Sequence, residues 1–141
     1  MNEHILNFLQ QQTCASMCVV DDQGKPYCFS AFYAFNPEAG LFYFKSSKGS
    51  HHAQLMSGHT AIAGTVLPDK LSKILVQGIQ FEGVVLDHAD PLTQKVSGYY
   101  HKKFPLALVL PGELWTVRAD HIKMTDSTQG FGKKIIWSRN S

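Results

Sequence analysis

The sequence predicts an α+β fold built around an antiparallel β-barrel, with a short N-terminal helix and one longer helix after a bent strand. Two observations lead to this prediction. Runs of β-branched and aromatic residues alternate with turn signals such as "DDQG" (Asp21–Gly24) and "NPEAG" (Asn36–Gly40). A long later run contains Gly78 and Gly83, and glycine inside a strand commonly marks the bend that a small closed barrel needs at its corners.

The first half of the chain predicts a helix, a three-strand meander and a second helix. Asn2 is a typical helix cap, and apolar residues follow it on one broad side, namely Ile5, Leu6, Phe8 and Leu9. Tight turns join three predicted strands, at Thr13–Val20, Tyr27–Phe35 and Leu41–Lys45. Ser50 is placed to cap a short helix through Leu55 and Met56, which Gly58 ends.

The second half predicts more strands around one helix. A fourth strand covers Thr60–Val66, and the long bent strand covers Ile74–Asp87. A helix begins at the cap Asp90, with Pro91 in its first position, and ends before Pro105. The late strands are expected at Leu114–Arg118, Ile122–Thr125 and Ile135–Trp137. No repeat or linker interrupts the chain, so we expect a single domain over residues 1–141.

Composition excludes several classes of protein. The chain has 141 residues, of which 44% are hydrophobic, so a packed core is expected. Its net charge is +2 and it has no long Lys/Arg block, which argues against a nucleic-acid partner. The start, "MNEHILNFLQQQ", lacks the features of a signal peptide, and no apolar run is long enough for a membrane span. We therefore expect a soluble, cytoplasmic protein that binds no membrane.

The three cysteines are Cys14, Cys18 and Cys28. An odd number without a C-x-x-C pair argues against a disulfide framework or a zinc knuckle. Cys14 and Cys18 lie four residues apart in a predicted strand and so face the same side. Two interpretations remain open: buried small hydrophobic residues in a reducing compartment, or a reactive thiol.

The segment "KSSKGSHHAQL" gathers cationic and hydroxyl side chains between two predicted strands. If Ser50 caps a helix, the free N–H groups of the first turn point toward the preceding residues. Lys45, Lys48 and His51 add positive charge, and Ser46 and Ser47 add hydroxyl donors. The segment is either a phosphate-type anion site or a solvated connection. We expect no metal here, because adjacent residues on a helix point about 100° apart and no further ligands lie nearby.

Other motifs carry weaker signals. "GFGKK" (Gly130–Lys134) lacks the third glycine of a dinucleotide loop and the spacing of a P-loop. It is either a flexible tail, or a loop from which Lys133 or Lys134 reaches an anionic ligand. Most of the aromatic residues belong in a core, although some are candidates to cover a planar ligand or a partner subunit. No nucleophile–histidine–acid pattern or carboxylate pair appears, so we assign no catalytic residue.

Five stretches together resemble a known family. They are "SAFYAFN" (Ser30–Asn36), "HAQLMSGHTAIAGTV" (His52–Val66), "VQGIQFEGVV" (Val76–Val85), "YHKKFP" (Tyr100–Pro105) and "IKMTDSTQGFGKKIIW" (Ile122–Trp137). They resemble the pyridoxamine 5'-phosphate oxidase-like family of FMN-binding split β-barrels, and most closely a short bacterial subfamily of it. The resemblance covers nearly the whole chain, and the last stretch is the most specific to the subfamily.

The resemblance implies a homodimer that binds FMN at the subunit interface. The phosphate would be held after the third strand by Ser50, His51 and His52, with His51 where the family usually has arginine or lysine. A neutral imidazole is a weaker anion ligand than either, and Lys45, Lys48 or Lys133 is placed to compensate. The isoalloxazine would lie near Ala31, Phe32 and Tyr33 and near Phe44, Lys45 and Ser46. Gln77 and Gly78 would approach from the bent strand, and Trp115 from the other subunit.

The implied activity is that of an FMN-dependent oxidoreductase acting on a small molecule. The cofactor supplies the chemistry, and the protein positions it and tunes its potential. The alternative is a protein without enzymatic activity that stores or carries a flavin or haem, with His51 or His52 as an iron ligand.

Overall fold

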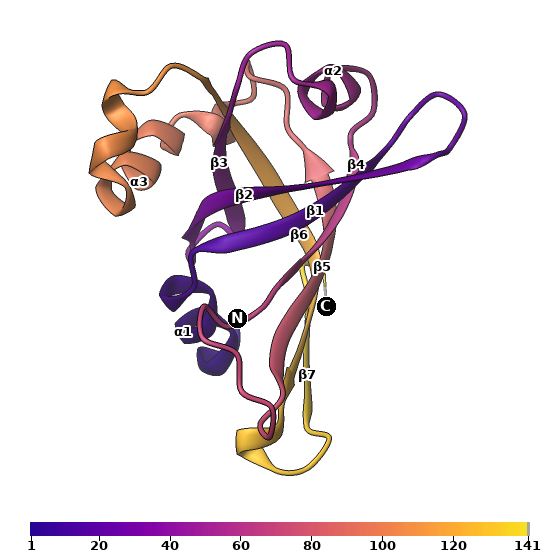
Figure 1. Ribbon diagram of the computed structural model, residues 1–141, viewed down its shortest axis with the longest axis vertical. Coiled ribbons are helices and arrows are strands. Elements are labelled where there is room, and N and C mark those ends of the chain that lie inside the picture. Colours follow the sequence, from indigo (N-terminus) through magenta and orange to yellow (C-terminus); the bar gives the residue numbers. More distant parts are fainter. Residues whose placement is uncertain (141) are drawn as a thin grey trace.

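Six strands close into an antiparallel barrel, which confirms the predicted α+β fold. The computed structural model describes residues 1–140. The strands are β1 (Cys14–Val20), β2 (Pro26–Asn36), β3 (Leu41–Ser46), β4 (Ala61–Val66), β5 (Gln77–Val85) and β6 (Glu113–Asp126). Their order is β3-β2-β1-β4-β5-β6, and pairing of β3 with β6 closes the ring (Figure 1). A seventh strand, β7 (Lys134–Ser138), extends the sheet from β6.

The core fills the barrel with alternate side chains of each strand. On β1, Ala15, Met17 and Val19 are buried, because successive residues of a strand point to opposite faces. Across the barrel, the rings of Phe42 and Phe81 stack with their centroids 4.3 Å apart. The residues between the buried positions of β1 therefore form an outer surface, which bears on the site described below.

Helix α1 (Glu3–Gln11) packs its apolar side against the barrel. Its side chains Ile5, Phe8 and Leu9 are buried in the main core cluster, as their clustering predicted. The side chain of Asn2 accepts a hydrogen bond from the His4 N–H, which confirms the predicted cap.

Gly83 marks the bend in β5, as the sequence predicted. The pairing of β5 with β6 shifts register between Glu82 and Gly83. A Cβ atom at Gly83 would lie 2.1 Å from the carbonyl oxygen of Arg118, so only glycine permits this approach of the two strands. The strand around it is shorter than predicted. The two late strands predicted on either side of Asp120 are one continuous strand, β6, because β5 pairs with β6 residues both before and after that point.

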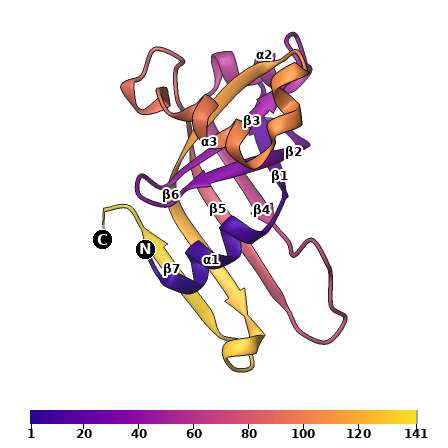
Figure 2. The same ribbon diagram turned by 90° about the vertical axis from the view of Figure 1, so that its left-hand side faces the viewer.

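The other helices flank the barrel. Helix α2 (His51–Gly58) begins after Ser50, whose side chain accepts from the Ala53 N–H, as predicted. The helix predicted from Asp90 is divided into a 3-10 turn (Pro91–Thr93) and α3 (Val96–Lys103), and the Thr93 hydroxyl donates to the Asp90 carbonyl in the first turn. Figure 2 shows α1 and α3 on the same side of the barrel. Within residues 1–140, no helix combines the length and apolar character needed to cross a membrane.

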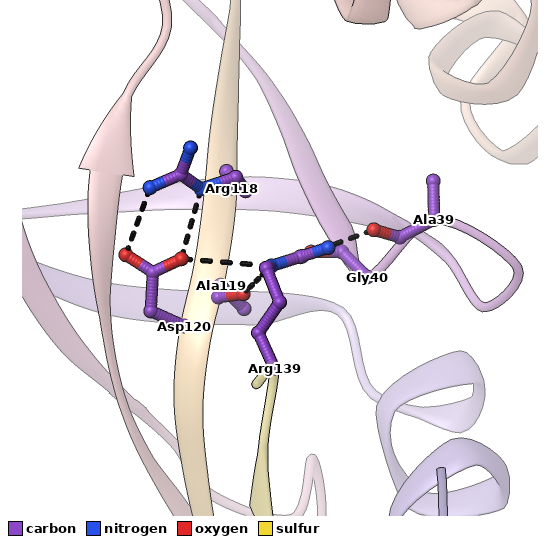
Figure 3. Close-up of polar contacts among 6 residues, drawn as sticks. All are labelled: Ala39, Gly40, Arg118, Ala119, Asp120 and Arg139. Atoms are coloured by element: carbon purple, nitrogen blue, oxygen red, sulfur yellow. Dashed lines mark hydrogen bonds and ion pairs between the residues drawn. The ribbon is translucent and has the colours of Figure 1, made fainter. Parts of the chain in front are cut away.

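The C-terminal end of the described chain is fastened to the barrel by one side chain (Figure 3). The guanidinium of Arg139 donates to three backbone carbonyl groups, those of Ala39, Gly40 and Ala119, at 2.8–3.0 Å. Asp120 lies 3.5 Å from Arg139 and forms a second, two-pronged pair with Arg118. These contacts tie the end of β7 to the turn between β2 and β3.

Candidate functional site

A pocket lies beside the start of α2, where the sequence predicted an anion site. Its volume is about 420 Å³. It is bounded by the outer side of β1 and β2, the end of β3 and the segment leading into α2, with one residue from α3. The lining residues are Cys14, Ser30, Ala31, Phe32, Lys45, Ser46, Ser47, His52 and Tyr100. Five of these were predicted to bind the cofactor: Ala31, Phe32, Lys45, Ser46 and His52.

The local chain path explains the hydroxyl groups at one end of the pocket. Strand β3 ends at Ser46, and Gly49 adopts a φ of +77°, a conformation that favours glycine and lets the chain turn into α2. Ser50 then caps the helix, and its Oγ lies 3.3 Å from that of Ser46. Two predicted phosphate ligands are therefore adjacent, with the N–H groups of the first turn of α2 beside them.

His52, and not His51, faces the pocket. The His52 ring stacks on Phe29 with centroids 3.9 Å apart, and its Nε2 is hydrogen-bonded to the Ser46 hydroxyl. Burial, and secondarily the neighbouring His51, lower the pKa of His52, so its neutral form is favoured. His51 is exposed, and its ring is perpendicular to that of Tyr27, with the two ring centroids 4.7 Å apart. The helical rotation of about 100° per residue separates the two imidazoles.

Lys45 provides a fixed positive charge on the pocket wall. Its side chain is half-buried, and its ammonium donates to the Ala107 carbonyl at 2.7 Å. The Nε2 atom of His101 lies 3.5 Å from the same ammonium. An ammonium has three N–H donors, so Lys45 keeps donor capacity for an anionic ligand while it is held in place.

Phe32 presents an exposed aromatic surface at the other side of the pocket. It is 55% exposed, which is unusual for a phenylalanine in the middle of a strand. Its ring stacks against Phe104 with centroids 5.5 Å apart. The neighbouring Ala31 also lines the pocket, although its side chain packs toward the main core.

Other predicted site residues lie elsewhere. Tyr33 and Phe44 pair across β2 and β3, and both side chains are fully buried, so only their backbone groups are available to a ligand. The side chain of Trp115 is 4% exposed and packs in the core of this barrel. The centroids of its ring and the His88 ring lie 4.5 Å apart. Trp115 was expected to contribute to the site of another subunit. Its side chain would then have to extend outward, and in this chain it does not.

The remaining predicted residues belong to the opposite end of the barrel. Gln77 pairs with Asp126 and donates to its carboxylate at 3.3 Å, and Gly78 follows on β5. Lys133 is exposed on the connection between β6 and β7. Figure 1 shows this connection at the far end of the molecule from α2. One chain therefore does not bring these three residues to the pocket.

Several residues that line the pocket were not predicted to bind a ligand. Cys14 lies opposite Phe32 in the pairing of β1 with β2, a register that follows from the turn at Asp21–Gly24 and was available from the sequence. Ser47, by contrast, had already been expected to supply a hydroxyl donor to the anion site. The position of Tyr100 depends on how α3 packs, which no local pattern reveals. Among residues 1–140, no three His, Cys, Asp or Glu side chains are grouped so as to hold a metal ion.

Comparison with known proteins identifies the family. No protein-family model matches the sequence. The UPF0306 protein YhbP of Escherichia coli (strain SMS-3-5 / SECEC) is 36% identical over 137 residues, which cover 97% of this chain and 92% of YhbP. The chain belongs to the UPF0306 family. Its similarity to YhbP spans the barrel, all three helices and the pocket.

Solved structures show how widely this UPF0306 fold is shared. A heme binding protein from Mycobacterium smegmatis matches with a TM-score of 0.76 and 9% identity, over 93% of this chain and 55% of that protein. A Clostridium acetobutylicum protein described as related to general stress protein 26, of the pyridoxinephosphate oxidase family, matches with a TM-score of 0.64 and 11% identity, over 97% and 93% of the two chains. At these identities the likeness shows the split-barrel fold alone.

Proposed function

We propose that this UPF0306 protein binds FMN in the pocket beside α2 and acts as a flavin-dependent oxidoreductase. One observation above all supports the proposal: a held ammonium, several hydroxyl groups and an exposed aromatic ring share one pocket of about 420 Å³. FMN combines a dianionic phosphate with a planar ring system, and each part finds suitable chemistry there. The split-barrel likeness to a protein of the pyridoxinephosphate oxidase family supports the same assignment.

The phosphate would lie at the start of α2. Hydroxyl donors of Ser46 and Ser47 line this end of the pocket, and Lys45 supplies positive charge. Free N–H groups in the first turn of a helix favour an anion, and the helix dipole adds to the effect. His52 would contribute as a neutral hydrogen-bonding partner that holds Ser46. His51 would not contact the phosphate, because it is turned toward Tyr27.

The isoalloxazine would cover Phe32. Its exposed ring offers a surface for stacking, and Ala31 leaves room for a planar group. Backbone groups of Tyr33 and Phe44 would contact the polar edge of the flavin. When bound, FMN supplies hydride or single-electron transfer, while the chain's own residues bind it and orient it.

We also propose that the active unit is a homodimer. Gln77, Gly78 and Lys133 lie at the end of the barrel away from the pocket, so a bound FMN meets them only if a second copy presents that end. The exposed Phe32 is consistent with a site that a partner completes.

Haem is the second candidate ligand. The likeness to the M. smegmatis heme binding protein favours it, and His52 is a histidine that lines the pocket. However, the Nε2 of His52 is hydrogen-bonded to Ser46 and the ring is stacked on Phe29, so iron binding would require this arrangement to change. The geometry therefore favours FMN.

Parallel titrations of the purified protein with FMN, riboflavin and haemin test the proposal. We expect saturable quenching of FMN fluorescence at micromolar concentrations and weaker binding of riboflavin, which lacks the phosphate. A haem Soret shift that His52→Ala abolishes, without any FMN binding, would establish the second candidate instead. Absence of binding by all three ligands would refute both.

A further inference from the structure

A pair of thiols lies on the outer face of the barrel, outside the candidate site. Cys18 on β1 and Cys28 on β2 are directly opposite each other in the strand pairing. Both are free, and the neighbouring Cys28 is among the causes that raise the pKa of the Cys18 thiol, after burial. Cys28 is exposed and Cys18 is half-buried, so of the two interpretations left open by the sequence, that of buried small hydrophobic residues does not hold for Cys28.

The hydrogen-bond pattern of the hairpin places this pair at a position suited to a disulfide. Tyr33 N–H donates to the Thr13 carbonyl, and Asp21 N–H donates to the Lys25 carbonyl. In an antiparallel pair, hydrogen-bonded and non-hydrogen-bonded positions alternate, so residue 18 faces residue 28 at a non-hydrogen-bonded position. Cα atoms at such positions are about 4.5 Å apart, inside the range of roughly 4.4–6.8 Å that disulfides span.

The surroundings leave the pair reachable and firmly positioned. Cys18 and Cys28 line a surface hollow of about 520 Å³, together with small residues of β4 such as Ala63 and Gly64. Strand β1 is paired on both sides, with β2 and with β4, so the Cys18 backbone is fixed. Ser16 lines the same hollow, and its Oγ lies 3.5 Å from that of Ser30 in the candidate pocket, so the thiols adjoin the candidate site without lining its pocket.

We propose that Cys18 and Cys28 are a redox-active dithiol, which a hydroperoxide converts to an intramolecular disulfide. The Cys28 thiolate attacks the distal oxygen of the hydroperoxide, the O–O bond breaks, and the alcohol (water, for hydrogen peroxide) leaves after taking a proton. Cys28 is then a sulfenic acid. The Cys18 sulfur attacks the sulfur of Cys28, and the hydroxyl leaves with the Cys18 proton as water. The two thiols give up two electrons, which the hydroperoxide accepts.

The division of roles follows from exposure. Cys28 meets the oxidant first because it is open to solvent. Burial, and secondarily Cys28 itself, raise the pKa of Cys18, which keeps it a thiol until the sulfenic acid forms beside it. Reduced protein is restored by an external dithiol through thiol–disulfide exchange.

Cys14 provides a matched control within the same strand. It faces the same side as Cys18, but the residue opposite it is Phe32, so it has no thiol partner across the strands. Oxidation of exposed cysteines in general would affect any accessible thiol, whereas the proposed pair reacts as a unit.

The test uses the purified 141-residue protein, reduced and then exposed to hydrogen peroxide. Remaining thiols are alkylated, and the chain is cleaved at Asp21 or Asp22, since Pro26 protects the Lys25 site from trypsin. Mass spectrometry should find the peptides that carry Cys18 and Cys28 joined, with a mass lower by two hydrogen atoms than their sum. Cys14→Ser should keep this link, and Cys18→Ser and Cys28→Ser should each lose it.

Four results would overturn the proposal. The first is absence of the link from oxidised Cys14→Ser protein, and the second is its persistence in Cys18→Ser. The third is a non-reducing gel in which the bond joins two chains. Cys28 that goes on to sulfinic acid while Cys18 remains fully alkylated would count equally against it.

Discussion

Replacing Lys45 with methionine should weaken FMN binding and leave riboflavin binding nearly unchanged. Methionine keeps an apolar stem of similar length but removes the ammonium that the Ala107 carbonyl holds at 2.7 Å on the pocket wall. One charge-assisted hydrogen bond to the phosphate contributes about 1–2 kcal/mol, because part of its strength is offset by lost hydration. The Kd for FMN should therefore rise by roughly 5- to 30-fold.

The assay is fluorescence titration of both ligands against both proteins. Riboflavin controls for packing around the ring system, because it lacks only the phosphate. Lys48→Met is the matched variant, since Lys48 is exposed in the same segment but does not line the pocket. Thermal unfolding of each variant checks for the loss of the contact with Ala107. Equal weakening of FMN and riboflavin binding by Lys45→Met, or a larger effect of Lys48→Met on FMN binding, would contradict a contact between Lys45 and the phosphate.

Three further predictions concern stability, measured by urea unfolding. Gly83→Ala should lower the free energy of unfolding by about 2 kcal/mol or more, because the new Cβ would lie 2.1 Å from a backbone oxygen. Gly98→Ala should raise the free energy of unfolding by about 0.5–1 kcal/mol, because alanine favours the helix and no atom lies within 4 Å of the new Cβ. Arg139→Ala should cost about 2–3 kcal/mol through its lost bonds to three carbonyl groups, with Arg139→Lys restoring only part, and a change under about 0.5 kcal/mol would contradict this. The pKa of His52 is lowered in the folded state, so the unfolded chain binds that proton more readily, and stability should fall as the pH drops below about 6.5. His52→Gln should show a shallower fall, and an identical pH profile would count against the burial of this ring.

Local signals in the sequence were sufficient for much of the fold. The turns after Val20 and Asn36 set the meander, and the hydroxyl of Ser50 does cap α2. The steric demand at Gly83 produces the bend in β5. Each of these features depends on a few neighbouring residues, and a sequence pattern can represent it.

Features that depend on distant partners were not predicted. β6 continues through Asp120 because β5 pairs with it both before and after that point, although Asp120 and His121 locally resemble a turn. Which of two adjacent histidines faces the pocket depends on the rotation of α2 against Phe29.

The same limit applies to the site. The hydroxyl-rich segment was recognised from its composition, and Lys45, Ser46 and His52 do line one pocket. The contribution of Tyr100 from α3 and the separation of Gln77 from the pocket are products of tertiary packing.

Whether the protein binds FMN is decided by the absorbance spectrum of freshly purified protein, together with the mass of the cofactor that it releases. We expect flavin bands in the visible region and a released molecule with the mass of FMN. Colourless protein that also fails to take up added FMN, or a bound chromophore with a Soret band and the mass of haem, would contradict this expectation.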